Sequence, residues 1–380
     1  MDKICTIIAL NYLPQAMALL ESTRKIYPDI PFFVLIIDSD TKDIPALASS
    51  IVLLPSDLDM PPLWIEQMKM YYDSMELATS LKPFLLKTLL TDGVSTVTFL
   101  DPDILLFDKL TEAFNSARDF GIVLTPHRLT PSSSLDAGLD EIAFLKYGIF
   151  NLGFISVGHS SKPMLLWWGE RLRWYCTKFP NDSVFTDQKW MNFVPAFFKH
   201  KVIYNPGYNL APWNIDERPL SLQNGSYFAG DKKLVFIHFS QMSGALAAGK
   251  LTNSWKNQKN LIDRANESLE LINSITREYS NNLVENGKKV IKIQLAHGSN
   301  IKLSYHQKKR LISKIKHADF SNSFQNQNVL RRKDTMKIWS KVTCSLEKSS
   351  ALNGFRDGLK LDTEKFIKLW RLRKRRTKKL

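Results

Sequence analysis

Cysteine is scarce in this chain of 380 residues, and the few cysteines present are not clustered in the sequence. Cys5, Cys176 and Cys344 are far apart and show neither a Cys-x-x-Cys pair nor a Cys/His spacing. Small disulfide-bonded domains need clustered cysteines, and structural zinc sites need Cys and His ligands at short spacings. The sequence therefore argues against both, and it fits a reducing compartment.

Long hydrophobic runs are missing as well. The apolar run in MDKICTIIAL is too short to span a bilayer, and Asn11, Pro14 and Gln15 follow it where a signal peptide would carry small residues. No run of about 18 apolar residues occurs elsewhere. We therefore expect a cytoplasmic protein without an export signal, whose contact with a membrane would be peripheral and on the inner face.

Two phosphate-binding motifs are also absent. The first apolar segment is not followed by Gly-x-Gly-x-x-Gly, and the chain has no Walker loop. These motifs carry the phosphate contacts of dinucleotide-binding and P-loop proteins. The sequence supports neither class.

The chain does have ample apolar material and a strongly basic end. Hydrophobic residues make up 44% of it, which suits a large single domain or a catalytic domain with an extension. Residues 281–380 hold 26 Lys and Arg against 7 Asp and Glu, so the net charge of +15 belongs to this end. The uneven charge predicts a boundary near Asn281 and a different function beyond it.

Apolar segments alternate with a helical pattern from the amino terminus. Residues 4–10 read as a buried strand, and residues 32–37 and 51–54 as a second and a third, short strand. Residues 14–26 carry apolar side chains at helical spacing. This alternation predicts an α/β fold with a parallel sheet, whose ligands bind at the carboxyl ends of the strands.

An Asp-Pro-Asp sequence follows the most marked strand pattern. Residues 96–100, TVTFL, suit a buried strand, and Pro102 stops the ladder directly after Asp101. Asp101 and Asp103 then lie in a turn at the carboxyl end of the strand, where both can reach one hard cation that bridges the oxygens of a diphosphate. Two acids in a solvated turn are the plain alternative.

Further polar residues stand in apolar surroundings, each with a structural alternative. Lys82 precedes Pro83 at a helix boundary within the leucine-rich stretch 75–90, where it could reach a phosphate or be solvated. Asn151 and Gly153 open a β-rich run, where glycine permits close approach of a ligand or marks a bulge.

Two later positions complete the set of candidates. Asp187 and Gln188 stand at the start of a helix, where an acid often only caps the helix. His238 interrupts the apolar strand pattern of residues 234–240, where a satisfied core histidine is the common alternative.

In their order along the chain these motifs resemble those of the GT-A glycosyltransferases, in particular the group that includes glycogenin and the bacterial lipopolysaccharide galactosyl- and glucosyltransferases. That group has a helix with a basic residue, an Asp-x-Asp strand, an Asn-x-Gly strand, an Asp-Gln helix start and a His-Phe-Ser strand. The resemblance covers roughly residues 1–255. The matching positions are Lys82, Asp101 and Asp103, Asn151 and Gly153, Asp187 and Gln188, and His238 with Phe239 and Ser240.

The resemblance implies a fold and a domain organisation. The fold would be α/β of the GT-A type, with a Rossmann-like mixed sheet and a basic C-terminal helical extension. A catalytic domain is expected at residues 1–255 and the extension, a candidate for membrane-surface attachment, at residues 256–380.

The resemblance also implies a reaction. A hexose or N-acetylhexosamine would pass from a nucleotide diphosphate sugar to a glycan or lipid-linked acceptor, with retained anomeric configuration, in surface polysaccharide synthesis. Asp101, Asp103 and His238 would hold Mn²⁺ or Mg²⁺, and imidazole among carboxylates suits Mn²⁺ better. The cation would neutralise the charge that grows on the leaving nucleoside diphosphate.

Other roles follow from the same resemblance. Asp187 and Gln188 would steady an oxocarbenium-like centre as the catalytic pair. The donor-binding residues would be Lys82, Asp101, Asn151 and Gly153.

The sequence departs from the group's pattern after His238. Members often continue with a phosphate-binding lysine, which here is Lys250, Lys256 or absent. Five residues could face the acceptor, and a packed turn is the alternative. They are the loop residue Arg128 and the aromatic and amide residues Tyr208, Asn209, Trp213 and Asn214.

Two rival functions use the same features differently. In aspartyl-phosphate phosphatases the first Asp of Asp-x-Asp is the nucleophile, but they place Thr or Val two residues after the second Asp, where this chain has Leu105. A nucleic-acid-binding protein would use the basic end, yet no nucleic-acid motif accompanies it. We therefore expect no nucleic-acid partner.

The last residues favour a membrane surface. Residues 362–380, DTEKFIKLWRLRKRRTKKL, place Phe366, Leu369 and Trp370 on one face of a helix among many Lys and Arg. Such a helix is expected to lie on an anionic membrane, and a solvated tail is the alternative.

Overall fold

The computed structural model describes residues 1–131, 141–178, 183–240, 266–290 and 313. The chain divides into one unit at Met1–Ala296 and a second at His297–Leu380. The predicted membrane helix at 362–380 and the candidate lysines Lys250 and Lys256 lie outside the described residues.

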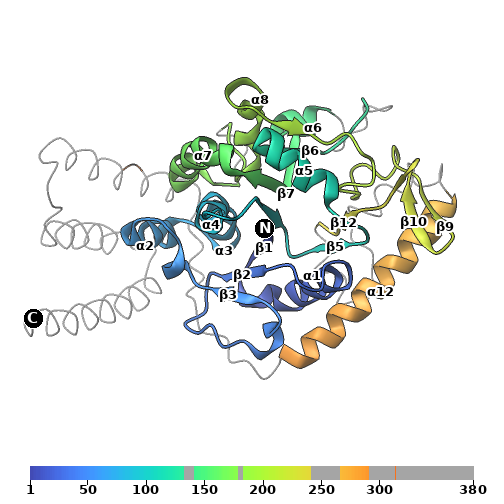
Figure 1. Ribbon diagram of the computed structural model, residues 1–380, viewed down its shortest axis with the longest axis horizontal. Helices are drawn as coiled ribbons and strands as arrows, with labels where there is room; N and C mark the ends of the chain where they lie inside the picture. The colour runs from blue at the N-terminus through green and yellow to red at the C-terminus, as the bar shows by residue number, and fades with distance from the viewer. Residues whose placement is uncertain (132–140, 179–182, 241–265, 291–312, 314–380) are drawn as a thin grey trace, which may run out of the picture. The chain divides into compact units, whose positions relative to one another are not determined.

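A seven-stranded sheet forms the centre of the first unit (Figure 1). Its strands are β1 (Asp2–Ile8), β2 (Phe32–Ile36), β3 (Ile51–Leu53), β4 (Thr96–Leu100), β6 (Ile122–Pro126), β7 (Phe150–Gly158) and β8 (Lys201–Val202). They are ordered β3-β2-β1-β4-β7-β6-β8, and only β7 is antiparallel to its neighbours. The predicted α/β fold with a mixed sheet is confirmed.

The central strands are buried along their whole length. Every residue of β2, β4 and β7 is buried, because helices cover both faces of the sheet. The predicted strand at 4–10 is displaced to Asp2–Ile8. It ends early because the Leu10 N–H donates to Asp38 Oδ1 at 2.9 Å instead of continuing the ladder.

Helices pack on both sides of this sheet (Figure 1). The α-helices described are α1 (Leu13–Ile26), α2 (Pro62–Tyr71), α3 (Ser74–Ser80), α4 (Lys82–Leu89), α5 (Thr111–Phe120), α6 (Glu141–Tyr147), α7 (Lys162–Tyr175), α8 (Val194–Phe197) and α12 (Asn266–Val290). Short 3₁₀ turns are η1 (Leu10–Tyr12), η2 (Pro45–Leu47), η3 (Pro55–Asp57), η4 (His159–Ser161) and η6 (Gln188–Phe193). Helices α1 and α5 lie on one side, and α3, α4 and α7 on the other.

The leucine-rich stretch 75–90 forms two helices, α3 and α4, with a break at Leu81. Pro83 lacks an N–H and its ring would clash with the carbonyl four residues earlier, so a continuous helix is disfavoured. Pro83 is tolerated in the first turn of α4, where the N–H groups have no helical partner. The break places Lys82 at the start of α4.

Two small sheets complete the described part of this unit. One pairs β5 (Ile104–Leu106) with β12 (Phe236–His238), and the other consists of β9 (Leu220–Gln223), β10 (Ser226–Ala229) and β11 (Lys232–Lys233). Both are antiparallel. The first brings a late strand beside the residues that follow β4.

Helix α12 packs on α1 and β9 (Figure 1). Its residues Ile272, Ile275 and Tyr279 join an apolar cluster with Ile237 and Phe239. This helix belongs to the first unit, although its residues fall in the predicted extension. The boundary after residue 255 stays a prediction. In the described part of the chain, no helix is both long and apolar enough to cross a membrane.

Candidate functional site

Asp101, Asp103 and His238 meet at the carboxyl end of β4. The Asp101 N–H extends the β4–β7 ladder by donating to the Gly153 carbonyl at 2.8 Å, and the chain then turns into β5. Strand β12 pairs with β5 so that His238 lies opposite Ile104, and the Phe239 N–H donates to the Asp103 carbonyl at 2.8 Å. Two segments far apart in the sequence are therefore held together by backbone hydrogen bonds.

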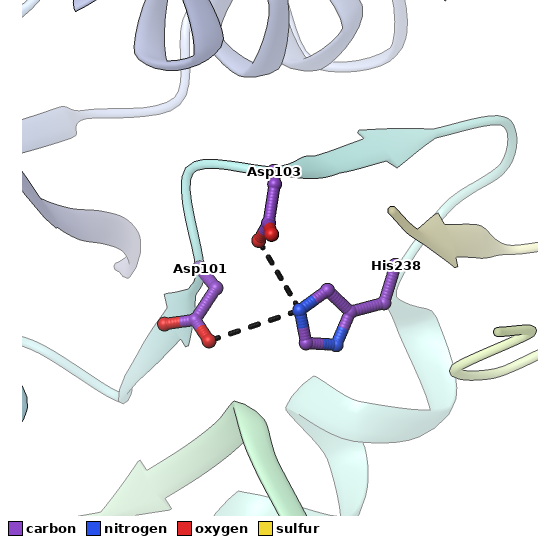
Figure 2. Close-up of side chains that lie close together, drawn as sticks. All are labelled: Asp101, Asp103 and His238. Carbon is purple, nitrogen blue, oxygen red and sulfur yellow. Dashed lines mark ion pairs between the residues drawn. The ribbon is translucent and has the colours of Figure 1, made fainter. Parts of the chain in front are cut away.

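The three side chains point toward one another (Figure 2). His238 Nε2 lies 3.1 Å from Asp103 Oδ1 and 3.8 Å from Asp101 Oδ2. One ligand atom from each residue lies within 4.8 Å of the others. Two carboxylates and one imidazole at this separation fit a divalent metal ion.

The electrostatics of this cluster favour a positive charge at its centre. Burial lowers the pKa of His238, but Asp103 and Asp101 more than offset it, so the pKa is raised. Burial raises the pKa of Asp101, with Asp103 and Asp187 adding to it and Lys82 and His238 opposing. A proton or a metal ion between the carboxylates relieves this repulsion.

Lys82 is buried behind the cluster and has three oxygen partners. Its Nζ lies 2.8 Å from Asp187 Oδ2, 2.8 Å from the Leu152 carbonyl and 3.3 Å from Asp101 Oδ1. The ammonium also lies 4.5 Å from the centre of the Phe99 ring. The ammonium therefore has one hydrogen-bonded carbonyl and two carboxylates around it. Lys82 therefore fixes the positions of two carboxylates.

Asp187 and Gln188 stand at the start of η6, as the sequence predicted for a helix start. Asp187 is buried, and its carbonyl accepts from Trp168 Nε1 at 3.1 Å. Thr186 before it has a φ of 43°, a left-handed conformation that is rare for a β-branched residue. Gln188 Nε2 donates to the Tyr147 carbonyl at 3.0 Å. The structure thus brings Asp187 to Lys82.

Asn151 and Gly153 both contact His238. Asn151 Oδ1 lies 3.1 Å from His238 Nδ1 and accepts from the Gly153 N–H at 3.2 Å. A Cβ at Gly153 would lie only 2.4 Å from His238 Cε1. The close approach that glycine was expected to permit is made by the imidazole ring.

The candidate acceptor-facing residues make contacts within the protein, and their role toward an acceptor stays a prediction. Arg128 makes a bidentate pair with Asp216, at 2.7 and 2.8 Å, and donates to the Trp213 carbonyl at 3.0 Å. Both terminal nitrogens of its guanidinium are therefore bonded within the protein. Tyr208, Asn209 and Asn214 are buried. Trp213 lies beside the cluster, with its ring edge-on to His238 at 5.6 Å between centroids.

Sequence reasoning missed His127. This residue follows β6 directly, is buried and lies 3.5 Å from Asn151, measured from His127 Nε2 to Asn151 Nδ2. Because β6 and β4 point the same way, both end at the same edge of the sheet. The strand-end rule that singled out Asp101 applies equally to His127.

Proteins of similar sequence include two from Bacillus subtilis (strain 168). No protein-family model matches the chain. Uncharacterized protein YfnF of Bacillus subtilis (strain 168) is 27% identical over 248 residues, covering 62% of this chain and 80% of the relative. Uncharacterized protein YfnD of the same organism is 23% identical over 250 residues, covering 62% and 76%.

The similar solved structures are glycosyltransferases. The galactosyltransferase LgtC, in complex with donor and acceptor sugar analogs, has a TM-score of 0.45 at 14% identity, covering 77% of this chain and 98% of that chain. Mouse xyloside xylosyltransferase 1 has a TM-score of 0.39 at 11% identity, covering 63% and 99%. The bifunctional WbbM has a TM-score of 0.40 at 15% identity, covering 63% and 45%. These neighbours belong to the GT-A group that the sequence motifs resemble.

Proposed function

We propose that this protein is a metal-dependent glycosyltransferase that uses a nucleotide diphosphate sugar as donor. The observation that carries the proposal is the convergence of Asp101, Asp103 and His238 at the carboxyl end of a buried strand. Carboxylates with imidazole suit Mn²⁺ better than Mg²⁺. A cation held there would supply the charge that stabilises a leaving diphosphate.

The residues behind the cluster have defined tasks in this proposal. Lys82 would hold Asp101 in the orientation that a ligand carboxylate needs and forms an ion pair with Asp187. Asp187 and Gln188 would face the sugar beneath its anomeric carbon. An anionic group there stabilises an oxocarbenium-like centre. Retention of the anomeric configuration is proposed from the resemblance of the motifs alone.

The substrate classes follow the resemblance of the motifs. We propose a hexose or N-acetylhexosamine as the group transferred and a glycan or lipid-linked acceptor, in surface polysaccharide synthesis. Peripheral attachment to an anionic membrane through residues 362–380 belongs to the same proposal.

A panel of nucleotide diphosphate sugars tests the donor class. The thermal unfolding of the purified protein is followed with each sugar, with and without Mn²⁺. A ligand that binds only the folded state raises Tm, by an amount that grows with its concentration over Kd. We expect one donor class to stabilise the wild type only when Mn²⁺ is present.

Two variants test whether this stabilisation depends on the proposed metal site. Asp103→Ala removes a proposed metal ligand and should lose the Mn²⁺-dependent stabilisation. Asp231→Ala removes an exposed carboxylate that pairs only with its neighbour Lys232 among the contacts described, and should keep the stabilisation. Equal stabilisation of wild type and Asp103→Ala by any nucleotide sugar would contradict the proposed site.

A further inference from the structure

The orientation of the Asn151 amide is fixed by the backbone. The Gly153 N–H can only donate, so the atom that it meets at 3.2 Å must be the amide oxygen, Oδ1. His238 Nδ1 meets the same oxygen at 3.1 Å. Because Oδ1 can only accept, His238 Nδ1 must carry a proton.

A second backbone group fixes the other end of the amide. His127 Nδ1 lies 3.1 Å from the Ile149 carbonyl, which can only accept, so this nitrogen also carries a proton. In neutral His127 the other nitrogen, Nε2, is then an acceptor. It meets Asn151 Nδ2 at 3.5 Å, the longest distance in the chain of contacts. Both backbone groups thus impose the same orientation on Asn151.

We propose that Asn151, oriented by the Gly153 N–H and by His127, is a positioning residue that makes Nε2 of His238 the nitrogen that faces the cation. This inference rests on the proposed metal site. With Nδ1 holding its proton toward Asn151, only Nε2 can offer a lone pair to the space between Asp101 and Asp103. Such a partner on the second nitrogen fixes the tautomer and ring orientation of a metal-binding histidine.

Gly153 completes the seat of the imidazole ring. A Cβ there would lie 2.4 Å from His238 Cε1 and 2.7 Å from Nδ1, closer than packed atoms come. The ring therefore lies directly against the backbone of β7. In this account the Asn-x-Gly sequence builds a support for His238, and its two residues act through that histidine.

Substitution of Asn151 tests the hydrogen bond. Asn151→Leu removes the acceptor at similar volume and should weaken Mn²⁺ binding by roughly 10–100-fold. Asn151→Asp keeps an acceptor for both N–H groups, and a carboxylate partner makes an imidazole more basic, so its affinity should equal or exceed that of the wild type. Ser156→Ala removes a buried hydrogen bond elsewhere on β7, to Thr98, and should leave the affinity unchanged.

Nitrogen-15 NMR of the metal-free protein detects the Nδ1–H group of His238 directly. It therefore distinguishes loss of this hydrogen bond from a general loss of stability. The wild type and Asn151→Asp should show a protected Nδ1–H signal from His238, and Asn151→Leu should lose it through exchange with water. Wild-type Mn²⁺ affinity together with a protected Nδ1–H in Asn151→Leu would overturn the inference. If the wild type binds no Mn²⁺, the proposed function fails, and the Nδ1–H signal still decides the orientation of His238.

Substitution of Gly153 tests the seat independently. Gly153→Ala should displace the ring and weaken Mn²⁺ binding. Gly158→Ala is the matched control, since its Cβ would lie 2.3 Å from the Ala117 carbonyl at the other end of β7. Both variants should lower Tm, but only Gly153→Ala should change Mn²⁺ affinity. An equal loss of Mn²⁺ affinity in both variants would mean that any distortion of β7 weakens binding. It would contradict a specific role of Gly153 in placing the His238 ring.

Discussion

Lys82 and Asp187 form a buried ion pair, with Nζ 2.8 Å from Oδ2 and side chains that are only 3% and 4% exposed. Burial lowers the pKa of Lys82, but Asp101 and Asp187 more than offset it, so the pKa is raised. The pair joins the first turn of α4 to the start of η6, which are distant in the sequence. Lys82 thereby positions both Asp101, a proposed metal ligand, and Asp187, a proposed catalytic residue.

Removing the ammonium should therefore destabilise the fold as well as the site. Lys82→Met leaves Asp101 and Asp187 without their shared cation, and breaking a buried pair costs about 3–5 kcal/mol. Urea unfolding at neutral pH measures the loss. The deficit relative to wild type should shrink on acidification, because the Asp101 carboxyl, whose pKa is raised by burial, can then take up a proton. A loss below about 1 kcal/mol, the size of an exposed pair, would mean that the ion pair is not structural.

Mn²⁺ binding should strengthen as pH rises. The carboxylates raise the pKa of His238, so a proton competes with the cation for Nε2 at and above the ordinary value of 6.5. Calorimetric titrations at about pH 6, 7 and 8 should show rising affinity, since ligand atoms must be deprotonated to bind a metal. A pH-independent affinity would contradict the assignment of His238 as a ligand.

His238→Ala separates the ligand role from a packing role. The variant should raise the Mn²⁺ concentration needed for activity, because one of three protein ligands is gone. His159→Ala is the control, since His159 lies at the opposite end of β7 and bonds the Val94 carbonyl. An unchanged Mn²⁺ requirement in His238→Ala would make this histidine an ordinary core residue.

His127 should remain neutral in the folded protein down to acidic pH. Burial lowers its pKa to about 4, whereas the ordinary value is 6.5. The unfolded chain therefore binds a proton at this residue between these two values and the folded chain does not, so stability should fall as pH drops through that window. NMR titration of His127 and urea unfolding at two pH values check the direction. A titration midpoint near 6.5 would contradict burial of the ring.

The part of the site that a single segment encodes was predictable from the sequence. Asp101 and Asp103 were found because an apolar strand and Pro102 define their position locally. The buried strands β1, β2, β4 and β7 were predicted to within a few residues for the same reason. These elements depend on side-chain patterns only a few residues long.

What depends on distant contacts was harder to predict. His238 was predicted to lie beside Asp103 only because the motifs resemble those of a known family. The pairing of β5 with β12, which brings the two residues together, leaves no local pattern in the sequence. Asn151 and Gly153 were expected to line a ligand, but their contacts with His238 arise only when β7 and β12 meet. The Lys82–Asp187 ion pair also joins residues that are distant in the sequence, so no local pattern predicts it.

The basic tail yields a separate prediction about membranes. Residues 362–380 carry many Lys and Arg, each worth about 1 kcal/mol near an anionic leaflet. Vesicles with acidic lipids should bind the full chain, high salt should release it, and deletion of 362–380 should abolish binding while donor hydrolysis continues. Equal binding to neutral and acidic vesicles would contradict this attachment.

The central claim is that Asp101, Asp103 and His238 hold a cation on which sugar transfer depends. The direct measurement is the rate of nucleoside diphosphate release from the best donor, followed against Mn²⁺ concentration in wild type, Asp103→Ala and Asp231→Ala. Wild type and Asp231→Ala should require Mn²⁺ and stop when a chelator is added. Asp103→Ala should lose at least about 100-fold at every Mn²⁺ concentration, since both a ligand and its charge are gone. Near wild-type, metal-independent turnover by Asp103→Ala would contradict the account.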